Sequence, residues 1–572
     1  MFEGTWEKVS QVAVQGAEYD SGERRPHPKC LEGTRVVLLN YIYRLLDTKK
    51  EKSRLIWLHG TAGVGKSAVA FTVAERMRGL KMTEETKREK RLAGTFFFSR
   101  KYTKRRTTGY FFVTLAYQLA INFPSVKTHV DKAIRDNPAL LHPDKALRDQ
   151  MEALFLQPLR QLKFRLQDCP PLTFVVDALD ECTPESFDQS TIDSLYEDKS
   201  ESELAELISL LAQALRDPDL PVTHILVTSR SEAHISEAMQ NEDVRPLVCE
   251  IPVKIFGKGV AATISLDGAD VDEDIYLYLE HSFRKLRSRC SAFPQPTKGQ
   301  LEQLAIRAGR RFIVASTMMK FIDDRYNDPC DRLQLMLELT SELLPGTEVY
   351  KLYDRILSTC ADPKRAYMHL SIVAALADPL PISQISKLLG PGEGRDVETA
   401  LAQLRSVLDI PTDSSLPVNI YHSSVRDYVS HHYNCSLPQV QCLTSPHSLL
   451  GLSSLQLMVR DIPESTALLD SLSKLNRLSQ AMDPQDPQTS PALNYACQNW
   501  AVHLSRASNP WDEKLAHVFK SFWDHHLLSW LERQWCVKDL QSWLTILSEG
   551  EKLAFRTHNL ICVCRTITPK LQ

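Results

Sequence analysis

The sequence predicts a multidomain protein with an α/β core, built on a mostly parallel sheet, followed by a helical region. Its 572 residues exceed the size of a single compact core and suggest about three to five domains. Between residues 34 and 240, short apolar runs alternate with amphipathic segments. Successive parallel strands need crossover connections of this kind, which are usually helices. After residue 270 strand signals become rare and helical periodicity dominates.

Four apolar runs mark the expected strands. In chain order they are LIWLHG (55–60), AGTFFFSR (93–100), PPLTFVVDALDE (170–181) and PVTHILVTSR (221–230). The intervening segments predict helices, among them VVLLNYIYRLL (36–46), SAVAFTVAERM (67–77) and a helix opening in TTGYFFVTLAYQLA (107–120). The polar residues 1–33 predict an irregular lead-in, and the apolar stretch LPVNIYHSSVRDYV (416–429) indicates a small β-wing.

Composition excludes several classes of function. The chain has 68 basic and 71 acidic side chains, a net charge of −3, which leaves no basic excess for a nucleic-acid backbone. Its 13 cysteines form no CxxC pair, which favours reduced thiols inside a cell. No apolar run reaches the ~18 residues of a membrane span, and the first residues lack the pattern of a secretion signal. We therefore expect a cytoplasmic protein that neither binds nucleic acid nor spans a membrane.

The strongest motif lies between the first apolar run and the helix after it. GTAGVGKS fits the pattern GxxxxGK[ST] without deviation and has the strand and helix that a P-loop requires. Glycines let the backbone N–H groups turn into one concavity around phosphates, and the following helix adds its positive N-terminal end. The lysine would meet the β- and γ-phosphates, and the hydroxyl would bind Mg²⁺. The predicted nucleotide-binding residues are Gly60, Thr61, Ala62, Gly63, Val64, Gly65, Lys66 and Ser67.

A second acidic motif should complete this site. The run Phe174–Asp177 is an apolar strand that ends in a carboxylate, the kind of oxygen ligand that Mg²⁺ prefers. Asp177 is therefore the predicted metal ligand, together with Ser67. Asp180 or Glu181 could then position or activate an attacking water. The alternative is an ordinary strand followed by an acidic turn.

Two groups of cations could also reach the phosphates. Arg230 ends the run ILVTSR; it would either sense the γ-phosphate or cap a strand and pair with Asp180. The basic cluster at residues 100–106 either contacts phosphates or forms a solvated loop. Because no NKxD motif follows the P-loop, adenine is favoured over guanine, so the expected ligands are ATP or ADP with Mg²⁺.

Beyond these motifs, the chain resembles fungal NACHT-type P-loop NTPases of the STAND class, also described as nephrocystin-like N-terminal domains. The matching segments follow in the family's order over nearly the whole chain and include CLEGTR (30–35), GTFFFSR (94–100), FVVDALDEC (174–182), FIVASTMMKFI (312–322), VNIYHSSVRDYV (418–429) and ALNYACQNWAVHL (492–504). Arg310 and Arg311 depart from the pattern, which usually has a glycine and a small or apolar residue there.

The resemblance implies both a domain order and several residue roles. The implied order is a lead-in (1–33), a NACHT-type P-loop domain (34–240), a helical domain (241–355), a winged-helix-like domain (356–436) and a C-terminal helical region (437–572). Asp180 and Glu181 would serve hydrolysis, and Arg230, grouped with them as a catalytic residue, would take the sensor role. His422 would contact the β-phosphate of ADP, although the sequence alone favours a structural histidine there.

The implied function is a switch between ATP and ADP states with slow, Mg²⁺-dependent hydrolysis. Such switches associate with themselves or with protein partners in the ATP state, and the resemblance suggests signalling in fungal non-self recognition or an innate-immunity-like response. Two alternatives come from other classes. One is a remodelling ATPase that turns over steadily, and the other is a P-loop scaffold without turnover.

Overall fold

The computed structural model describes most of the chain as two compact units. One comprises Met1–Glu185 and Ser194–Glu348, and the other Ser186–Asp193 and Val349–Gln572. The described residues are 3–25, 27–49, 54–82, 89–182, 193–253, 269–338, 348–440, 444–462, 490–537, 546–548 and 550–553.

A five-stranded parallel sheet forms the centre of the first unit. Its strands are β1 (Arg54–Gly60), β2 (Leu92–Phe97), β3 (Leu172–Asp177), β4 (Thr223–Ser229) and β5 (Val248–Val253), in the order β2-β3-β4-β1-β5. The first four strands confirm the predicted α/β core. They are buried almost throughout, which explains their continuous apolar sequences.

The fifth strand corrects the expected end of this core at residue 240. β5 pairs in parallel with β1 and closes one edge of the sheet. Only Ile251 and Val253 of its residues are buried. A half-exposed edge strand needs no long apolar run, so its sequence gives a weak signal.

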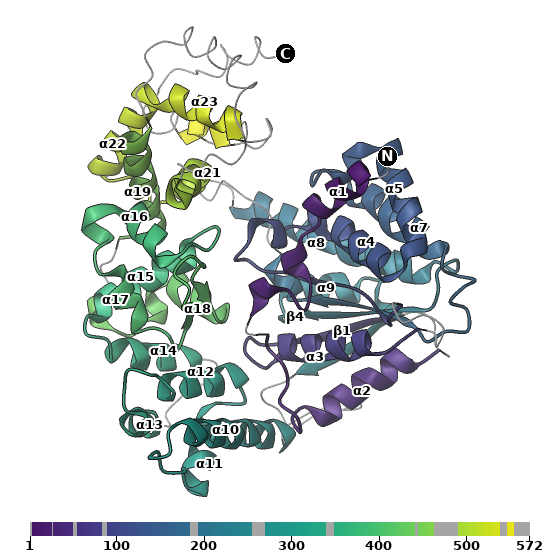
Figure 1. Ribbon diagram of the computed structural model, residues 1–572, viewed down its shortest axis with the longest axis horizontal. Helices are drawn as coiled ribbons and strands as arrows, with labels where there is room; N and C mark the ends of the chain where they lie inside the picture. Colours follow the sequence, from purple (N-terminus) through teal and green to yellow (C-terminus); the bar gives the residue numbers. More distant parts are fainter. Residues whose placement is uncertain are drawn as a thin grey trace. The chain divides into compact units, whose positions relative to one another are not determined.

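Helices cover both faces of the sheet (Figure 1). One face carries α2 (Val36–Asp47) and α3 (Lys66–Gly79), which share a core with Ile56, Leu58 and Val175. The other face carries a larger core with Trp57, Phe96 and many helical residues. The helices that surround it are α1 (Glu3–Val12), α4 (Phe111–Asn122), α5 (Lys127–Asp136), α6 (Leu147–Met151), α7 (Gln157–Arg160), α8 (Asp193–Arg216) and α9 (Ala233–Gln240).

The expected irregular lead-in, residues 1–33, contains the helix α1. Helix α1 packs on α4 and α5, with Val9 fully buried and the Trp6 ring stacked on Tyr117 at a centroid distance of 5.3 Å. After α1, the Val14 N–H donates to Thr114 Oγ1 (3.1 Å). The sequence of this segment does not predict these contacts. Few of its residues are apolar, and their partners lie about a hundred residues further along the chain.

Helices make up the rest of the first unit and most of the second. In the first unit they are α10 (Ala269–Arg289), α11 (Lys298–Arg307), α12 (Phe312–Ile322) and α13 (Pro329–Leu337). The second unit contains α14 (Glu348–Ser358), α15 (Pro363–Ala375), α16 (Ile382–Glu393), α17 (Val397–Ala402), α18 (Ser424–Ser430), α19 (Pro446–Asp461), α21 (Pro491–Ser505), α22 (Glu513–His525) and α23 (Leu527–Val537).

An antiparallel pair of strands, β6 (Leu408–Asp409) and β7 (Asn419–Ile420), lies between α17 and α18 in the second unit. It falls in and just before the stretch for which the sequence predicts a β-wing. Among the described residues, no helix is both long enough and apolar enough to cross a membrane.

The packing of α1 can be tested by substitution. Val9→Ala should lower the free energy of unfolding by about 1–2 kcal/mol, because it removes methyl groups from a fully buried position. Val37→Ala is a suitable control, since Val37 is 50% exposed and should change stability by less than about 0.5 kcal/mol. Equal urea denaturation midpoints for Val9→Ala and the parent would show that α1 is not part of the core.

Candidate functional site

The loop between β1 and α3 has the backbone geometry of a phosphate-binding loop. Gly60, Gly63 and Gly65 have φ angles of 156°, 81° and 95°, which favour glycine. Lys66 begins α3, and its Nζ donates to the carbonyl oxygens of Gly60 (2.8 Å) and Thr61 (2.9 Å). The lysine therefore lies curled over the loop, where phosphates could replace the carbonyls as its partners.

Two segments distant in sequence hold the outer side of this loop. Arg35 donates from Nη2 to the Val64 carbonyl (2.6 Å), and Arg311 donates from Nη1 to the Ala62 carbonyl (3.3 Å). The Ile313 N–H donates to the Gly63 carbonyl (3.2 Å). A Cβ at Gly63 would lie 2.1 Å from Ile313 Cγ2, so the loop and the start of α12 fit closely.

A sharp turn before α12 accommodates Arg310 and Arg311, the two residues that depart from the family pattern. Gly309 and Arg310 both have left-handed backbones (φ 56° and 61°), which turn the chain sharply between α11 and α12. Arg310 pairs with Asp272 (3.1 Å), and Arg311 is buried against the P-loop. In this chain the helices after the sheet reach the P-loop through an arginine rather than a small residue.

Asp177 lies at the end of β3, where Ser67 and Thr228 converge on it. Thr228 Oγ1 donates to Asp177 Oδ1 (2.6 Å), and the Ser67 side chain hydrogen-bonds to the same carboxyl group. Burial raises the pKa of Asp177, while Arg24 and these hydrogen bonds oppose the rise. A serine hydroxyl and a carboxylate at bonding distance are oxygen donors that suit Mg²⁺, which also needs few protein ligands. The residues therefore fit the predicted metal site.

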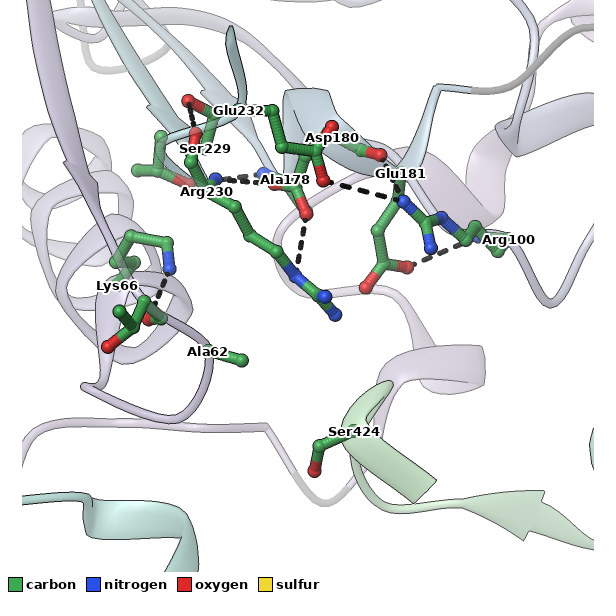
Figure 2. Close-up of polar contacts among 12 residues, drawn as sticks. Ala62, Lys66, Arg100, Ala178, Asp180, Glu181, Ser229, Arg230, Glu232 and Ser424 are labelled. Atoms are coloured by element: carbon green, nitrogen blue, oxygen red, sulfur yellow. Dashed lines mark hydrogen bonds and ion pairs between the residues drawn. The ribbon is translucent and has the colours of Figure 1, made fainter. Parts of the chain in front are cut away.

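Asp180 and Arg230 form a close pair beside Lys66. Because β3 and β4 are neighbours, Arg230 follows β4 and lies next to the acidic turn after β3. The Arg230 backbone N–H donates to Asp180 Oδ1 (2.9 Å), and Arg230 Nε lies 3.1 Å from Asp180 Oδ2. Burial and the charge of Glu181 raise the pKa of Asp180, whereas Lys66 and Arg230 oppose that rise. Figure 2 shows Arg230 between Lys66 and the Asp180–Glu181 turn.

Glu181 is held by Arg100, which follows β2. The Arg100 backbone N–H donates to Glu181 Oε2 (3.2 Å), and Arg100 Nη2 donates to the Asp180 carbonyl (2.7 Å). Burial favours the neutral form of Glu181, but the charge and N–H of Arg100 together lower its pKa below the usual value. Two members of the basic cluster, Arg105 and Arg106, are buried, so this segment is not the solvated loop that the sequence allows.

His422 lies in the second unit, just before α18. Its Nδ1 accepts a hydrogen bond from the Ser424 N–H (3.1 Å) and lies 2.8 Å from Ser424 Oγ. An Nδ1 that accepts from an N–H carries no proton itself, so the neutral ring has its proton on Nε2. Nε2 is therefore a hydrogen-bond donor.

Several further residues shape the site without having been predicted from the sequence. His59, one residue before the P-loop, lies 2.8 Å from Ser231 Oγ and 2.9 Å from Glu250 Oε1. It thus joins the start of the loop to the residue after Arg230. Arg24 and Arg35 were missed as well. His59 lies beside the P-loop motif and Arg35 ends the segment CLEGTR, but neither position indicates these contacts, and Arg24 lies in polar sequence without a motif.

Comparison with known proteins supports the P-loop core. A family model described as nephrocystin 3, N-terminal, matches residues 35–230, about a third of the chain. Solved structures that match include a Walker-type ATPase of Pyrococcus abyssi, PabY2304, with 17% sequence identity over 71% of this chain and 98% of that one. The TM-score of this match is 0.33. No curated protein matches.

The family match begins at Arg35 and ends at Arg230, and therefore encloses the P-loop, Asp177 and the acidic turn. Together with the parallel sheet and its helices, it identifies the core as a P-loop NTPase fold followed by helical regions. Such a fold indicates a function that depends on a nucleotide.

The charge state of Lys66 gives the site a testable pH dependence. Burial lowers the pKa of Lys66 to about 8, with Asp180 opposing the shift. Phosphates would restore its charge, so ADP binding should take up about half a proton at pH 8, and affinity should fall as the pH rises further. Calorimetry in two buffers of different ionisation enthalpy measures this uptake.

Lys66→Arg is the matched control, because arginine stays charged over this range and should remove most of the proton uptake. Identical binding enthalpies for the parent protein in both buffers would contradict the assignment of Lys66 to the phosphates.

Proposed function

We propose that this protein is an ATP/ADP-dependent switch of the STAND class with slow hydrolysis. The observation that carries the proposal is the double contact of Arg230 with Asp180 beside Lys66. A γ-phosphate would offer Arg230 a second anionic partner at the same place. The arginine could then distinguish ATP from ADP by exchanging one partner for the other.

The remaining residues have roles that follow from their contacts. The P-loop N–H groups and Lys66 would bind the phosphates, while Ser67 and Asp177 would hold Mg²⁺, which neutralises phosphate charge. Glu181 is kept anionic by Arg100 and would orient the attacking water. Asp180 would keep its hydrogen bond from the Arg230 backbone N–H after the guanidinium turns to the γ-phosphate, which favours Glu181 as the residue that acts on the water.

The switch itself would depend on the second unit. In this proposal residues 356–436 act as a winged-helix-like domain, which the pair β6–β7 between α17 and α18 supports. His422 would donate from Nε2 to the β-phosphate of ADP and favour a closed state. ATP would favour an open state that associates with itself or with protein partners in the cytoplasm. A nucleotide shifts this equilibrium only by its difference in affinity for the two states.

Two rivals make different predictions about turnover. A remodelling ATPase would hydrolyse ATP quickly and respond to a substrate, whereas a scaffold would not hydrolyse it at all. The nucleotide that co-purifies with the protein separates them most directly. Bound ADP supports the switch, and an empty site favours a rival. A role in fungal non-self recognition or immunity-like signalling rests on the resemblance alone.

Hydrolysis should depend on the Glu181 carboxylate. Glu181→Gln keeps the shape of the side chain and removes its charge, so ATP binding should persist while single-turnover phosphate release slows at least about 100-fold. The exposed Glu237→Gln on α9 is the control and should leave the rate unchanged. If Glu181→Gln releases phosphate at the parent's rate, another group acts on the water.

His422 can be tested through ADP release. His422→Ala should remove a hydrogen bond made only in the closed state and speed ADP dissociation about 5- to 100-fold, with a smaller change for ATP. The exposed His431→Ala serves as the control from the same unit. Stopped-flow displacement of a fluorescent ADP measures both rates. Equal rates for His422→Ala and the parent would make His422 a structural residue.

A further inference from the structure

A segment before the P-loop domain reaches the candidate metal site. Residues 15–25, called here the N-terminal arm, lie against the edge strand β2 and helix α3. The Tyr19 N–H donates to Thr95 Oγ1 of β2 (3.0 Å), and the Tyr19 ring packs against Phe71 of α3 at a centroid distance of 5.6 Å. Arg24 donates from Nη1 to the Tyr19 carbonyl (2.7 Å), which fixes the arginine relative to the sheet.

Arg24 lies beside Asp177. Its guanidinium covers the ring of Phe97, with Cζ 3.6 Å from the ring centroid. Phe97 and Asp177 are register partners on β2 and β3, so their side chains leave the same face of the sheet at the same level. That face also carries α3, from which Ser67 bonds to Asp177.

The charges of the two groups interact. Burial raises the pKa of Asp177, and Arg24 is the first group to oppose that rise. Burial likewise lowers the pKa of Arg24 to about 10, and Asp177 opposes the fall. Arg24 therefore supplies positive charge to the carboxylate that would also bind a divalent cation.

We propose that Arg24 and Mg²⁺ compete for Asp177, so that the N-terminal arm docks on the ligand-free site and loosens when Mg²⁺ and nucleotide bind. This inference rests on the proposed function, because it requires a Mg²⁺-dependent nucleotide site. Mg²⁺ carries twice the charge of Arg24, and two cations beside one buried carboxylate repel each other.

The surroundings of Arg24 indicate that the N-terminal arm, and not the core, would move when Mg²⁺ binds. Arg105 lies on the same side, where its Nε donates to the Phe97 carbonyl (3.1 Å) and its Nη1 lies 3.9 Å from Glu23 of the arm. Bound Mg²⁺ would add a further positive centre to these two arginines. Arg105 is buried within the core, whereas Arg24 lies on a segment between short elements and is only half-buried.

Docking of the arm and binding of Mg²⁺·ADP must then affect each other equally. If a docked arm weakens Mg²⁺·ADP binding by some factor, bound Mg²⁺·ADP weakens docking by the same factor. Binding of Mg²⁺·ADP would therefore release the arm, and the released arm would report the state of the site at a distance from the nucleotide.

Hydrogen exchange and calorimetry on the full chain test this competition. In the parent, amides of residues 15–25 should exchange at least about fivefold faster with Mg²⁺·ADP than with EDTA. Arg24→Gln should exchange fast in both conditions and bind Mg²⁺·ADP about three- to tenfold more tightly. The adjacent exposed Arg25→Gln is the matched control and should behave as the parent does. Arg24→Lys retains the charge and should also resemble the parent.

Three outcomes would overturn the inference. One is unchanged exchange in the arm of a parent protein that binds Mg²⁺·ADP. Another is an Arg24→Gln variant that binds Mg²⁺·ADP no more tightly than the parent, which would make Arg24 a supporting residue instead. The third is a parent that binds no Mg²⁺·ADP at all, and this alone would overturn the proposed function as well.

Discussion

The constraint on which the site depends is a carboxylate buried at the end of a central strand. Asp177 is 3% exposed, and a buried anion without partners would take up a proton instead of binding a metal. The structure surrounds it with the Ser67 and Thr228 side chains and with the charge of Arg24. Each partner comes from a different element, so the order of the strands and the docking of the arm both serve this one group.

The sheet order follows from the same requirement. β4 lies between β1 and β3, and Val176 pairs with Val227, which places Thr228 level with Asp177. Thr228 Oγ1 also accepts from the Ala178 N–H (3.1 Å), where the chain leaves β3 with a left-handed φ of 55°. This turn, unusual for alanine, directs Asp180 and Glu181 back toward the P-loop. The inserted strand thus fixes Asp177, the candidate metal ligand, and the acidic turn together.

Local patterns predicted the parts of this arrangement that depend on neighbours in sequence. GTAGVGKS and the four apolar runs gave the P-loop, the central strands and the carboxylates, because glycine, burial and strand length act within a few residues. Arg35 could not be predicted in the same way: its N–H donates to Asp274 (3.0 Å), 239 residues away. Arg311 looked like a departure from a family pattern, yet its contact with Ala62 depends on the turn at Gly309–Arg310. Such contacts arise only once the chain is folded.

The charged groups of the site already have partners among one another. Arg230 is paired with Asp180, Arg100 holds Glu181, and Lys66 bonds to loop carbonyls while burial weakens its charge. A nucleotide must therefore displace existing partners rather than fill an unsatisfied pocket, and part of its binding energy is used in doing so. Such a site binds a nucleotide less tightly. Its affinities for two nucleotides differ more, however, when the two displace different side-chain partners. That property suits a protein that responds to which nucleotide is bound better than one that only binds tightly.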